Sequence, residues 1–495
     1  MKTTFLHGRY AEGNGDLAER FGTDADADAN LNEHFTRYGQ HEMRGIKAED
    51  YIRLEAVFCS DRGHIQLAGW ADRRLIHSFH VTVEVGYIRY DLGEVAPCWY
   101  ERADVTAVTG DTQQDSGYLA LLKIDGLILH SGVRILINDK KMYDEPAMRW
   151  LSVDSFLTRS LSACAVLADQ QVGNTLSHAQ ALYPQYAEIW GEYLDGLTFS
   201  RAFQHRAQAS VARSIIITLH RKAEMLLIQL DSLAEALTRD GETEVIVIGN
   251  ELAGAQLLVE QLGAFCQIHD IPLSLHLCSG NSGFSAGNNH GAEIARGEIL
   301  IFMNPDIFPP ETAPERGTDF LFSDPGEDLH GALLYYGDGM LMHSGMYTTA
   351  DLAFNARSGV SAPVLRVEHF GKGLTHHVDD AADIIAPTLA AIAGQPVLAS
   401  AALWKIGKTV FDAVGGLPID YLFAYYEDAD FCLALRGQGR DIVIDNTARW
   451  IHMEGVGKAK PPHVRSFMWL NRALYSQKFA DSDLLADESA DLSLL

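Results

Sequence analysis

The clearest candidate for chemistry in the sequence is a carboxylate that ends an apolar strand. The run 298–303 (EILIFM) is followed directly by Asn304, Pro305 and Asp306. An aspartate beside a proline turn can serve the turn's own hydrogen bonding. One or two protein carboxylates are, however, also enough to hold a divalent cation on a diphosphate. Asp306 is therefore a candidate metal ligand.

A second group of acids begins a predicted helix further along the chain. Glu427, Asp428 and Asp430 lie within four residues, ahead of the apolar residues of that helix. Acids in a first helical turn are stabilised by capping and by the helix dipole. Three acids exceed that need, and their repulsion can shift a pKa toward the value that a general base requires. His452 ends the next strand, where an imidazole is either structural or a metal ligand.

A loop rich in glycine and asparagine precedes the strand that Asp306 ends. Its glycines, Gly280, Gly283, Gly287 and Gly291, do not form the G-x-G-x-x-G fingerprint, and the chain has no P-loop motif. Small residues let a ligand approach the backbone, and the N-terminus of the following helix favours negative charge. The other interpretation is a tight turn that only closes a crossover.

Strands and helices alternate in the second half of the chain, and this alternation positions the acids. The predicted strands 214–220 and 244–250 have unbroken apolar runs at their centres, III and VIVI, and a helix with leucines at helical spacing lies between them. This pattern predicts a mostly parallel, Rossmann-like α/β sheet with helices on both faces. Ligands bind beyond the carboxyl ends of such strands. Thr218, Asn250 and Asp306 should therefore surround one crevice.

Changes in composition divide the chain into five parts. Short β-rich runs punctuated by glycine and aspartate in the first third are typical of an antiparallel sandwich. We predict a small helical segment over 1–50, a β-sandwich-like domain over 51–145, a helical connector over 146–208, the α/β domain over 209–480 and an acidic tail over 481–495.

The charge balance and the cysteines exclude several classes of protein. The chain has 39 basic and 66 acidic residues, and its net charge of −27 argues against binding to nucleic acid. Its six cysteines include no C-x-x-C pair, as is usual in a reducing compartment. Neither a secretory signal nor a membrane-spanning apolar run is visible. These patterns predict a cytoplasmic protein, and peripheral association with the inner face of the cell membrane is left open.

In combination, these motifs resemble glycosyltransferase family 2, whose members are inverting enzymes with the GT-A fold. The resemblance rests on a first strand ending in TLHR and on three further stretches: GNSGFSAGNNHGAEIARGEILIFMNPD, VGGLPIDYLFAYYEDADFCLALRGQG and ARWIHMEGVGK. It covers residues 212–478 and is closest to the bacterial rhamnosyltransferase and galactofuranosyltransferase branch.

This resemblance implies a role for each candidate residue. Asp306 and His452 would hold Mg²⁺ or Mn²⁺ on the diphosphate of a sugar nucleotide. Asp428 would take the proton from the acceptor hydroxyl, while Glu427 and Asp430 would orient the acceptor. Six residues would contact the donor: Thr218, Asn250, Asn281, Gly287, Asn288 and Asn304.

Two positions depart from the family pattern. The second strand usually ends in an aspartate that reads the nucleobase, but here it ends in Asn250. An amide can still hydrogen-bond to a base edge, so the nucleotide is not determined. Asn304 stands in place of the first aspartate of the D-x-D motif, which leaves one negative charge fewer on the cation.

The resemblance therefore implies a metal-dependent inverting glycosyltransferase that moves a sugar from a UDP- or dTDP-linked donor to a glycan or glycolipid acceptor. It also implies a setting in bacterial surface polysaccharide synthesis. The oligomeric state is not determined by the resemblance. A catalytically silent carbohydrate-binding or scaffold protein is one alternative, but it would have no chemical reason to retain Asp306, Asp428 and His452 together. A nucleotidyltransferase would need a glycine-rich basic loop after the first strand, which TLHRKAEM does not provide.

Overall fold

The computed structural model describes residues 51–76, 78–109, 115–168, 172–206, 210–220, 223–252, 254–309, 314–355, 360–373, 397–453 and 460–485. The helical segment expected over 1–50 and most of the acidic tail lie outside these residues. The chain divides into two compact units, Met1–Gln170 and Gln171–Leu495. No helix within the described ranges is long and apolar enough to cross a membrane.

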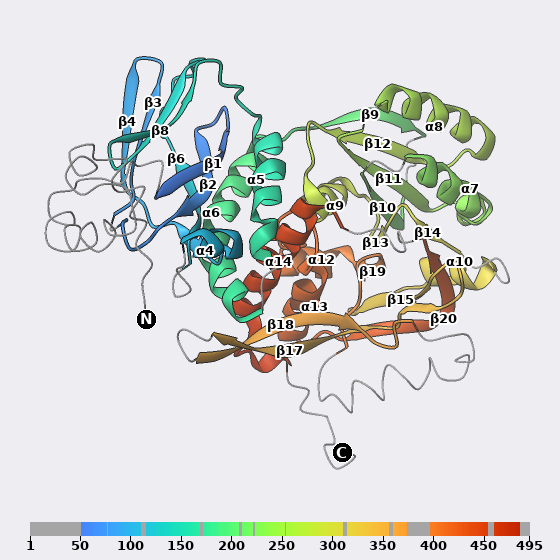
Figure 1. Cartoon of the computed structure of the whole chain (residues 1–495). Helices are drawn as coiled ribbons and strands as arrows, with labels where there is room; N and C mark the ends of the chain where they lie inside the picture. Colours follow the sequence, from blue (N-terminus) through green and yellow to red (C-terminus); the bar gives the residue numbers. More distant parts are fainter. Residues whose placement is uncertain are drawn as a thin grey trace, which may run out of the picture. The chain divides into compact units, whose positions relative to one another are not determined.

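The first unit contains two four-stranded antiparallel sheets that share one core (Figure 1). The strands are β1 (Ile52–Cys59), β2 (His64–Ala71), β3 (His80–Val85), β4 (Ile88–Glu94), β5 (Cys98–Tyr100), β6 (Gly117–Lys123), β7 (Val133–Ile137) and β8 (Lys140–Glu145). One sheet has the order β1-β2-β6-β5 and the other the order β4-β3-β7-β8. Two helices accompany them, α4 (Ala103–Thr109) and α5 (Val153–Ala168).

Alternating side chains explain why these strands form a sandwich. In β7 the sequence VRILI buries Val133, Ile135 and Ile137 in the shared core. Arg134 points to the opposite face, where its guanidinium lies 2.9 Å from Glu84 of β3. Successive residues of a strand face opposite sides, so this pattern leaves one face apolar and one face charged. The antiparallel sandwich predicted upstream of the α/β region is confirmed.

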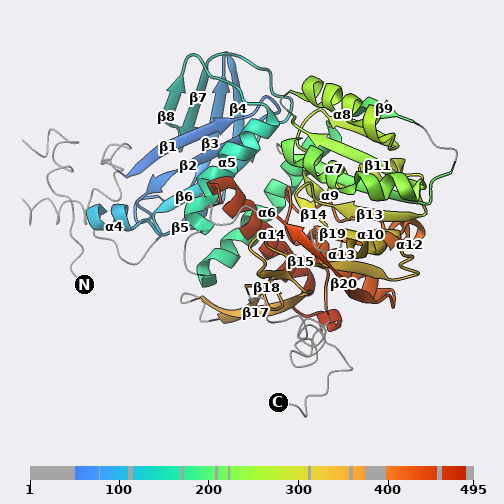
Figure 2. The ribbon, with the colours of Figure 1, turned by 90° about the vertical axis from the view of Figure 1, so that its right-hand side faces the viewer.

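A ten-stranded sheet forms the centre of the second unit (Figure 2). Its strands are β9 (Phe199–His205), β10 (Arg213–His220), β11 (Thr243–Asn250), β12 (Leu273–Cys278), β13 (Ile299–Met303), β14 (Ile307–Phe308), β15 (Leu329–Tyr335), β16 (Leu341–His343), β19 (Leu403–Gly407) and β20 (Ile442–His452). They are arranged as β14-β20-β15-β19-β13-β10-β11-β12-β9, with β16 paired to β15. The strands β13, β10, β11 and β12 at its centre are parallel, which confirms the predicted core. The edge strand β9 falls within the range expected to be a helical connector.

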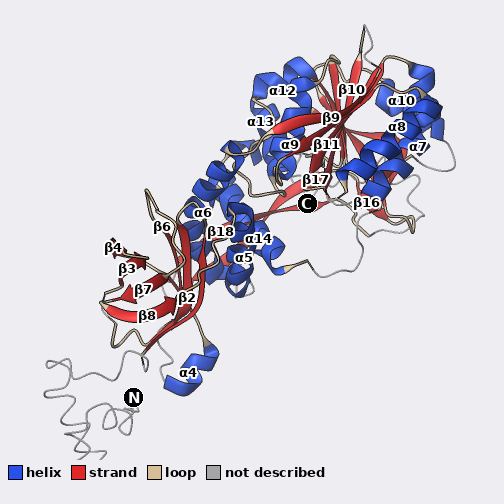
Figure 3. Ribbon diagram, turned by 90° about the horizontal axis from the view of Figure 1, so that it is seen from above, coloured by secondary structure: helices blue, strands red, loops and turns tan. Residues whose placement is uncertain are grey.

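Helices cover both faces of this sheet, as continuously apolar strands require. They are α7 (Ala223–Asp240), α8 (Ala255–His269), α9 (Gly283–Ile294), α10 (Pro314–Phe322), α12 (Lys408–Val414) and α13 (Glu427–Gly437). Figure 3 shows α7, α8 and α10 on one side of the strands and α9, α12 and α13 on the other. The aromatic rings of Phe302 in β13 and Phe411 in α12 lie 5.0 Å apart, so α12 packs directly on the sheet.

Two glycines let α9 lie close to β10. A side chain at Gly291 would come within 2.4 Å of Ile216 Cγ2, and one at Gly287 within 3.0 Å of Thr218 Cγ2. The two glycines are four residues apart and therefore face the sheet from the same side of the helix. Part of the glycine pattern in this loop and helix thus serves the packing of the helix on the sheet.

A hairpin and two long helices complete the second unit. They are α6 (Val172–Asp195), β17 (Met346–Asn355), β18 (Val360–His369) and α14 (Pro462–Phe479), followed by the short 3-10 helix η3 (Asp483–Leu485). The hairpin is fastened to α14 by buried hydrogen bonds, Thr348 to Tyr475 at 2.7 Å and Leu365 to Ser476 at 2.9 Å. This packing places the end of β18 beside the candidate site.

Candidate active site

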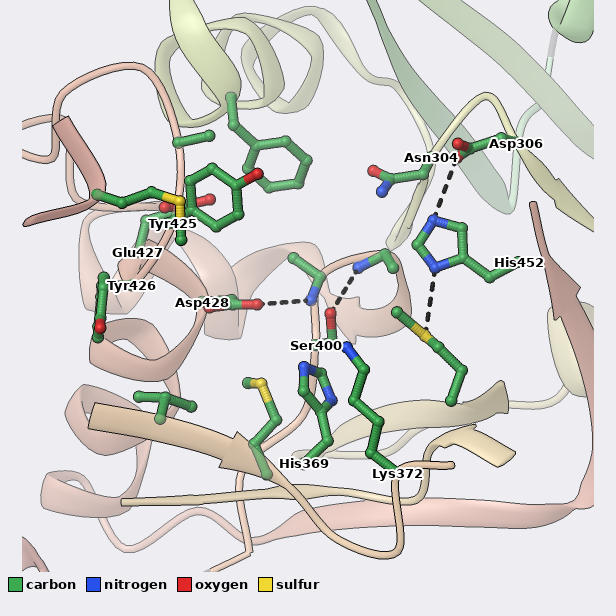
Figure 4. Close-up of a pocket in the computed structure, with 18 residues that line it drawn as sticks. Asn304, Asp306, His369, Lys372, Ser400, Tyr425, Tyr426, Glu427, Asp428 and His452 are labelled. Atoms are coloured by element: carbon green, nitrogen blue, oxygen red, sulfur yellow. Dashed lines mark hydrogen bonds and ion pairs between the residues drawn. The ribbon is translucent and has the colours of Figure 1, made fainter. Parts of the chain in front are cut away.

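A cavity of about 410 Å³ opens in the second unit where several sheet strands begin or end (Figure 4). Its polar lining consists of Asn304, Asp306, His369, Lys372, Ser400, Tyr425, Tyr426, Glu427, Asp428 and His452. The rest of its wall is largely apolar. Ligands of open α/β sheets bind at such a position. The cavity brings Asp306, His452, Glu427 and Asp428 together, although they come from two distant parts of the chain.

Asp306 and His452 form a close pair on one side of this cavity. Asp306 Oδ1 lies 3.2 Å from His452 Nε2, and both side chains are more than nine-tenths buried. The pairing of β14 with β20 fixes their approach, because Ile307 lies directly opposite His452 in the ladder. In addition, the backbone N–H of Met453 donates to the carbonyl oxygen of Asp306 at 2.9 Å. The other ring nitrogen of His452, Nδ1, lies 3.4 Å from Met342 Sδ.

A buried glutamine on α7 holds the turn that presents Asp306. Gln229 Nε2 donates to the carbonyl oxygens of Asn304 and Ile307, each at 2.7 Å. Gln229 is fully buried. Carbonyl groups buried without a partner are costly, so this amide stabilises the one backbone conformation that directs Asp306 toward His452.

Glu427 and Asp428 begin α13 across the cavity from Asp306 (Figure 4). Asp428 Oδ1 accepts the N–H of Ala429 at 2.9 Å, and Oδ2 accepts that of Ala401 at 3.4 Å. Glu427 is 5% exposed, and its Oε2 has no hydrogen-bond partner among the described residues. Burial raises the pKa of both carboxyls, and the charge of Asp428 raises the pKa of Glu427 further. Burial thus favours the neutral form of both carboxyls, while the two backbone N–H groups favour the ionised form of Asp428.

The segment before α13 has an unusual backbone. Three non-glycine residues in 423–426 have positive φ, at 57°, 81° and 77°, a conformation rare for bulky side chains. Buried Asn471 of α14 secures them. Its side chain accepts the N–H of Leu422 at 2.9 Å and donates to the carbonyl oxygens of Leu422, Ala424 and Tyr425 at 3.0, 2.9 and 3.3 Å. The start of α13, and with it Asp428, depends on this amide.

The amide of Asn250 bonds to the chain's own loop. Asn250 is 1% exposed and lies outside the cavity lining. Its Oδ1 accepts the hydroxyl of Ser282 at 2.7 Å and the N–H of Ser282 at 3.2 Å, while its Nδ2 donates to the carbonyl of Gly283 at 3.1 Å. Asn281 Oδ1 accepts the N–H of Gly283 at 3.0 Å, which tightens the same loop.

The other residues expected to contact the donor also bond within the fold. Thr218 Oγ1 donates to Asn288 Oδ1 at 3.0 Å, and Asn288 Nδ2 donates to the carbonyl of Phe284 at 3.0 Å. These bonds join β10 to α9 beside the close approach at Gly287. Of the six expected donor contacts, Asn304 lines the cavity. The other five hold β10, β11 and the start of α9 together.

Asp430, expected to orient the acceptor, lies outside the cavity lining. Its Oδ2 accepts the hydroxyl of Tyr421 and the ammonium of Lys478, both at 2.8 Å. Lys478 Nζ also lies 2.8 Å from Asp420 Oδ2. The carboxylate of Asp430 therefore anchors α13 to α14.

Sequence reasoning missed the part of the lining that follows the hairpin and precedes β19. His369, Lys372 and Ser400 all line the cavity but belong to no motif. His369 ends β18 as Asp306 follows β13 and His452 ends β20. A polar residue at a strand end is thus the signal that could have found it.

Residues 214–340 match the model of the family described as glycosyl transferase family 2. The chain contains a glycosyltransferase family 2 region. This region runs from β10 to the residue before β16, so it includes the parallel centre of the sheet, α9 and the turn that carries Asp306. Asp428 and His452 follow it in the chain and join it in space.

A curated relative and several solved structures are similar to this chain. The uncharacterized protein y4gI of Sinorhizobium fredii (strain NBRC 101917 / NGR234) is 27% identical over 287 residues. The match covers 56% of this chain and 29% of the relative, so the chain spans less than a third of that protein's length.

Two of the solved structures contain a bound nucleotide or sugar nucleotide with Mn²⁺. The mannosyltransferase PcManGT from Pyrobaculum calidifontis, in complex with GDP-Man and Mn²⁺, is 15% identical, with a TM-score of 0.34 over 65% of this chain and 82% of that chain. GalNAc-T7 with UDP, GalNAc and Mn²⁺ is 14% identical, with a TM-score of 0.34 over 53% of this chain and 48% of that chain. TarS 1-349 of S. aureus is 13% identical, with a TM-score of 0.32 over 55% and 74%.

Proposed function

We propose that the second unit is a metal-dependent, inverting glycosyltransferase. Its donor would be a UDP- or dTDP-linked sugar, and its acceptor a hydroxyl of a glycan or glycolipid. The observation that carries the proposal is one cavity that joins the Asp306–His452 pair to the Asp428 carboxylate at the edge of a family 2 sheet. A leaving diphosphate requires positive charge, and an attacking hydroxyl requires a base. The cavity offers a place for both.

Asp306 and His452 fit a divalent cation. A carboxylate oxygen and an imidazole nitrogen suit Mn²⁺ and, with phosphate and water, Mg²⁺. Two adjacent ligands of one octahedral ion lie about 3 Å apart, and these two atoms are separated by 3.2 Å. The described residues contain no cluster of three or more His, Cys, Asp or Glu side chains that could hold an ion. Donor phosphates and water would supply the other ligands. When bound, the ion would stabilise negative charge on the departing diphosphate.

Asp428 serves as the general base in this proposal. Burial raises its pKa, which suits a base, and the two backbone N–H groups that donate to it favour its ionised form. Asp428 takes the proton of the acceptor hydroxyl while the new C–O bond forms at the anomeric carbon. The bond from that carbon to the diphosphate oxygen breaks on the opposite face, so the configuration inverts. A positioned base contributes about 10²- to 10⁴-fold to such a step.

The experiment that tests this proposal is a calorimetric titration of UDP, dTDP and GDP into the purified full chain, with Mn²⁺ and again with EDTA. Binding of one nucleotide that depends on the metal is expected and would define the donors to screen for transfer. Folded protein that binds none of the three would overturn the proposal. That outcome would favour a silent carbohydrate-binding or scaffold protein with the same fold.

A further inference from the structure

Two histidines beside the proposed base form a hydrogen-bonded pair. His343 ends β16 and His369 ends β18, and their Nδ1 atoms lie 2.8 Å apart. His343 is 1% exposed, whereas His369 lines the cavity and lies below Ser400 in Figure 4. Neither ring takes part in the Asp306–His452 pair or in the proton transfer proposed for Asp428.

The backbone beside this pair determines where the ring protons lie. The N–H of Ser400 can only donate, and it lies 3.3 Å from His343 Nε2. His343 Nε2 is therefore without a proton, and a neutral imidazole then carries its proton on Nδ1. It follows that His343 Nδ1–H donates to His369 Nδ1. The proton of His369 is left on Nε2.

Both rings are neutral near pH 7. Burial lowers the pKa of His343 well below its usual value and lowers the pKa of His369 to about 4. The positive charge of Lys372, three residues after His369, lowers both further. Extra protonation would also place two N–H groups against each other across 2.8 Å. The hydrogen-bonded series from Ser400 through His343 to His369 thus allows one placement of the ring protons.

This arrangement leaves a hydrogen-bond donor on the cavity wall. His369 Nε2 has no hydrogen-bond partner in the part of the chain that the structure describes. Lys372 lines the same wall and carries a positive charge. The carboxyl groups of Asp306 and Asp428, which line the same cavity, accept hydrogen bonds. The wall formed by His369 and Lys372 therefore matches an anionic oxygen better than a hydroxyl proton.

We propose that His369 donates its Nε2–H to the diphosphate of the donor substrate, with His343 as the positioning residue that fixes the tautomer. This inference rests on the proposed function and names a residue of the same site. It predicts that the imidazole acts while neutral and that a side chain with an N–H in the same place can replace it.

The first test is an NMR spectrum of the full chain with ¹⁵N-labelled histidine. Long-range ¹H–¹⁵N correlations distinguish a protonated ring nitrogen from a bare one, and the His343→Phe and His369→Phe spectra assign the signals. We expect Nδ1–H for His343 and Nε2–H for His369. A proton on Nδ1 of His369 would overturn the proposed hydrogen-bond series, whether or not the protein transfers sugar.

The second test is binding of the nucleoside diphosphate that the titration identifies, with Mn²⁺. We expect His369→Phe to raise its Kd about tenfold, because a hydrogen bond to a charged group is lost. The Kd of His369→Gln should stay within about threefold of that of the unchanged protein, because the amide N–H of Gln can replace Nε2–H. Binding with Mg²⁺, which does not broaden NMR signals, should also shift the Nε2 resonance of His369.

The matched control is His276→Gln on β12, a half-buried histidine outside the cavity lining. It should leave the Kd unchanged. An unchanged Kd in His369→Phe, or equal losses in the Phe and Gln variants, would exclude donation to the diphosphate. If the unchanged chain binds no nucleotide, the proposed function fails together with the diphosphate role. The tautomers in the spectrum still decide the proton arrangement in that case.

Discussion

Glu427 and Asp428 are adjacent in the chain, yet their carboxyl groups have different hydrogen-bonding environments. Asp428 accepts backbone N–H groups from Ala401 and Ala429, whereas Glu427 Oε2 has no partner among the described residues. Hydrogen bonds to a charged form favour it, and burial without them favours the neutral form. The same pair of acids can therefore supply one base and one uncharged carboxylic acid.

This division predicts that two conservative amide substitutions behave differently. Asp428→Asn should lower the rate of sugar transfer by about 10²-fold or more, because the base is lost. Glu427→Gln should retain transfer within about tenfold, because an amide resembles the protonated acid that it replaces. Initial rates measured with saturating donor and acceptor would test both variants.

Nucleotide binding provides the control for these variants. Both should bind the nucleoside diphosphate with Mn²⁺ as tightly as the unchanged chain, since neither residue belongs to the Asp306–His452 pair. Normal turnover by Asp428→Asn would remove Asp428 from the role of base. A greater loss in Glu427→Gln than in Asp428→Asn would reverse the assignment of the two acids.

The buried Glu427 also predicts a pH dependence of stability. Its pKa in the folded chain is raised well above the ordinary 4.5. A raised folded pKa means that the native protein retains a proton that the unfolded chain releases. The stabilisation that this proton gives is complete below the pKa of Glu427 in the unfolded chain. It is lost as pH rises through the pKa of Glu427 in the folded chain. Glu427→Gln should therefore gain thermal stability relative to the unchanged chain as pH rises from about 5 to 8.

Differential scanning fluorimetry over that pH range would measure this difference in Tm. Asp412→Asn is a suitable control, because Asp412 lies exposed on nearby α12. Its Tm should follow that of the unchanged chain at every pH. A Tm difference for Glu427→Gln that stays constant with pH would show that Glu427 is ionised in the folded protein.

The Asp306–His452 pair predicts how metal and nucleotide binding are linked. Asp306→Asn and His452→Phe should each weaken nucleotide binding in the presence of Mn²⁺ by at least about tenfold, as expected when a metal site is disturbed. The weak binding that remains with EDTA should be unaffected. Calorimetry with and without EDTA separates the two. The exposed Asp319→Asn on α10 is the control, and equal Kd values for it and Asp306→Asn would place the metal elsewhere.

The fold was largely predictable from the sequence because its signals are local. Unbroken apolar runs at the centres of 214–220 and 244–250 marked buried parallel strands, which are β10 and β11. The short β-rich runs of the first third indicated a sandwich, and one of them, VRILI, forms β7 with alternate residues in the core. These patterns depend on neighbours within a few residues, so a single sequence contains them.

The site was less predictable because its supporting contacts are distant in the chain. Gln229 holds a carbonyl 75 residues away, and Asn471 holds a loop 49 residues away. A polar residue in a helix gives no local sign that it faces inward. Asn250 illustrates the opposite case, in which a residue expected to bind the donor bonds to the protein. A polar residue at a strand end can hydrogen-bond either to a ligand or to a neighbouring loop. The amide of Asn250 bonds to Ser282 and Gly283 in the structure.

The amide of Asn471 predicts a loss of catalysis without loss of the sheet. Asn471→Ala removes four hydrogen bonds from the strained segment 423–426 and its start at Leu422. Several buried backbone groups would lose their partner, at about 1–3 kcal/mol for each group left unsatisfied. We expect faster proteolysis within this segment and a fall in kcat of at least about tenfold. Gln477→Ala removes an exposed amide on the same helix and should change neither proteolysis nor kcat. An unchanged kcat in Asn471→Ala would show that Asp428 is positioned without this segment.

Gln229 predicts a separable effect on the metal side of the cavity. Gln229→Met keeps a side chain of similar length but removes the N–H donors that hold the carbonyls of Asn304 and Ile307. The turn carrying Asp306 should loosen, so Mn²⁺-dependent nucleotide binding should weaken about tenfold. The exposed Gln256→Met on α8 is the matched control. Because Asp428 lies across the cavity, kcat at saturating nucleotide-sugar should fall less than kcat/KM for the donor. An equal fall in both would mean that Gln229 supports the whole cavity rather than the turn.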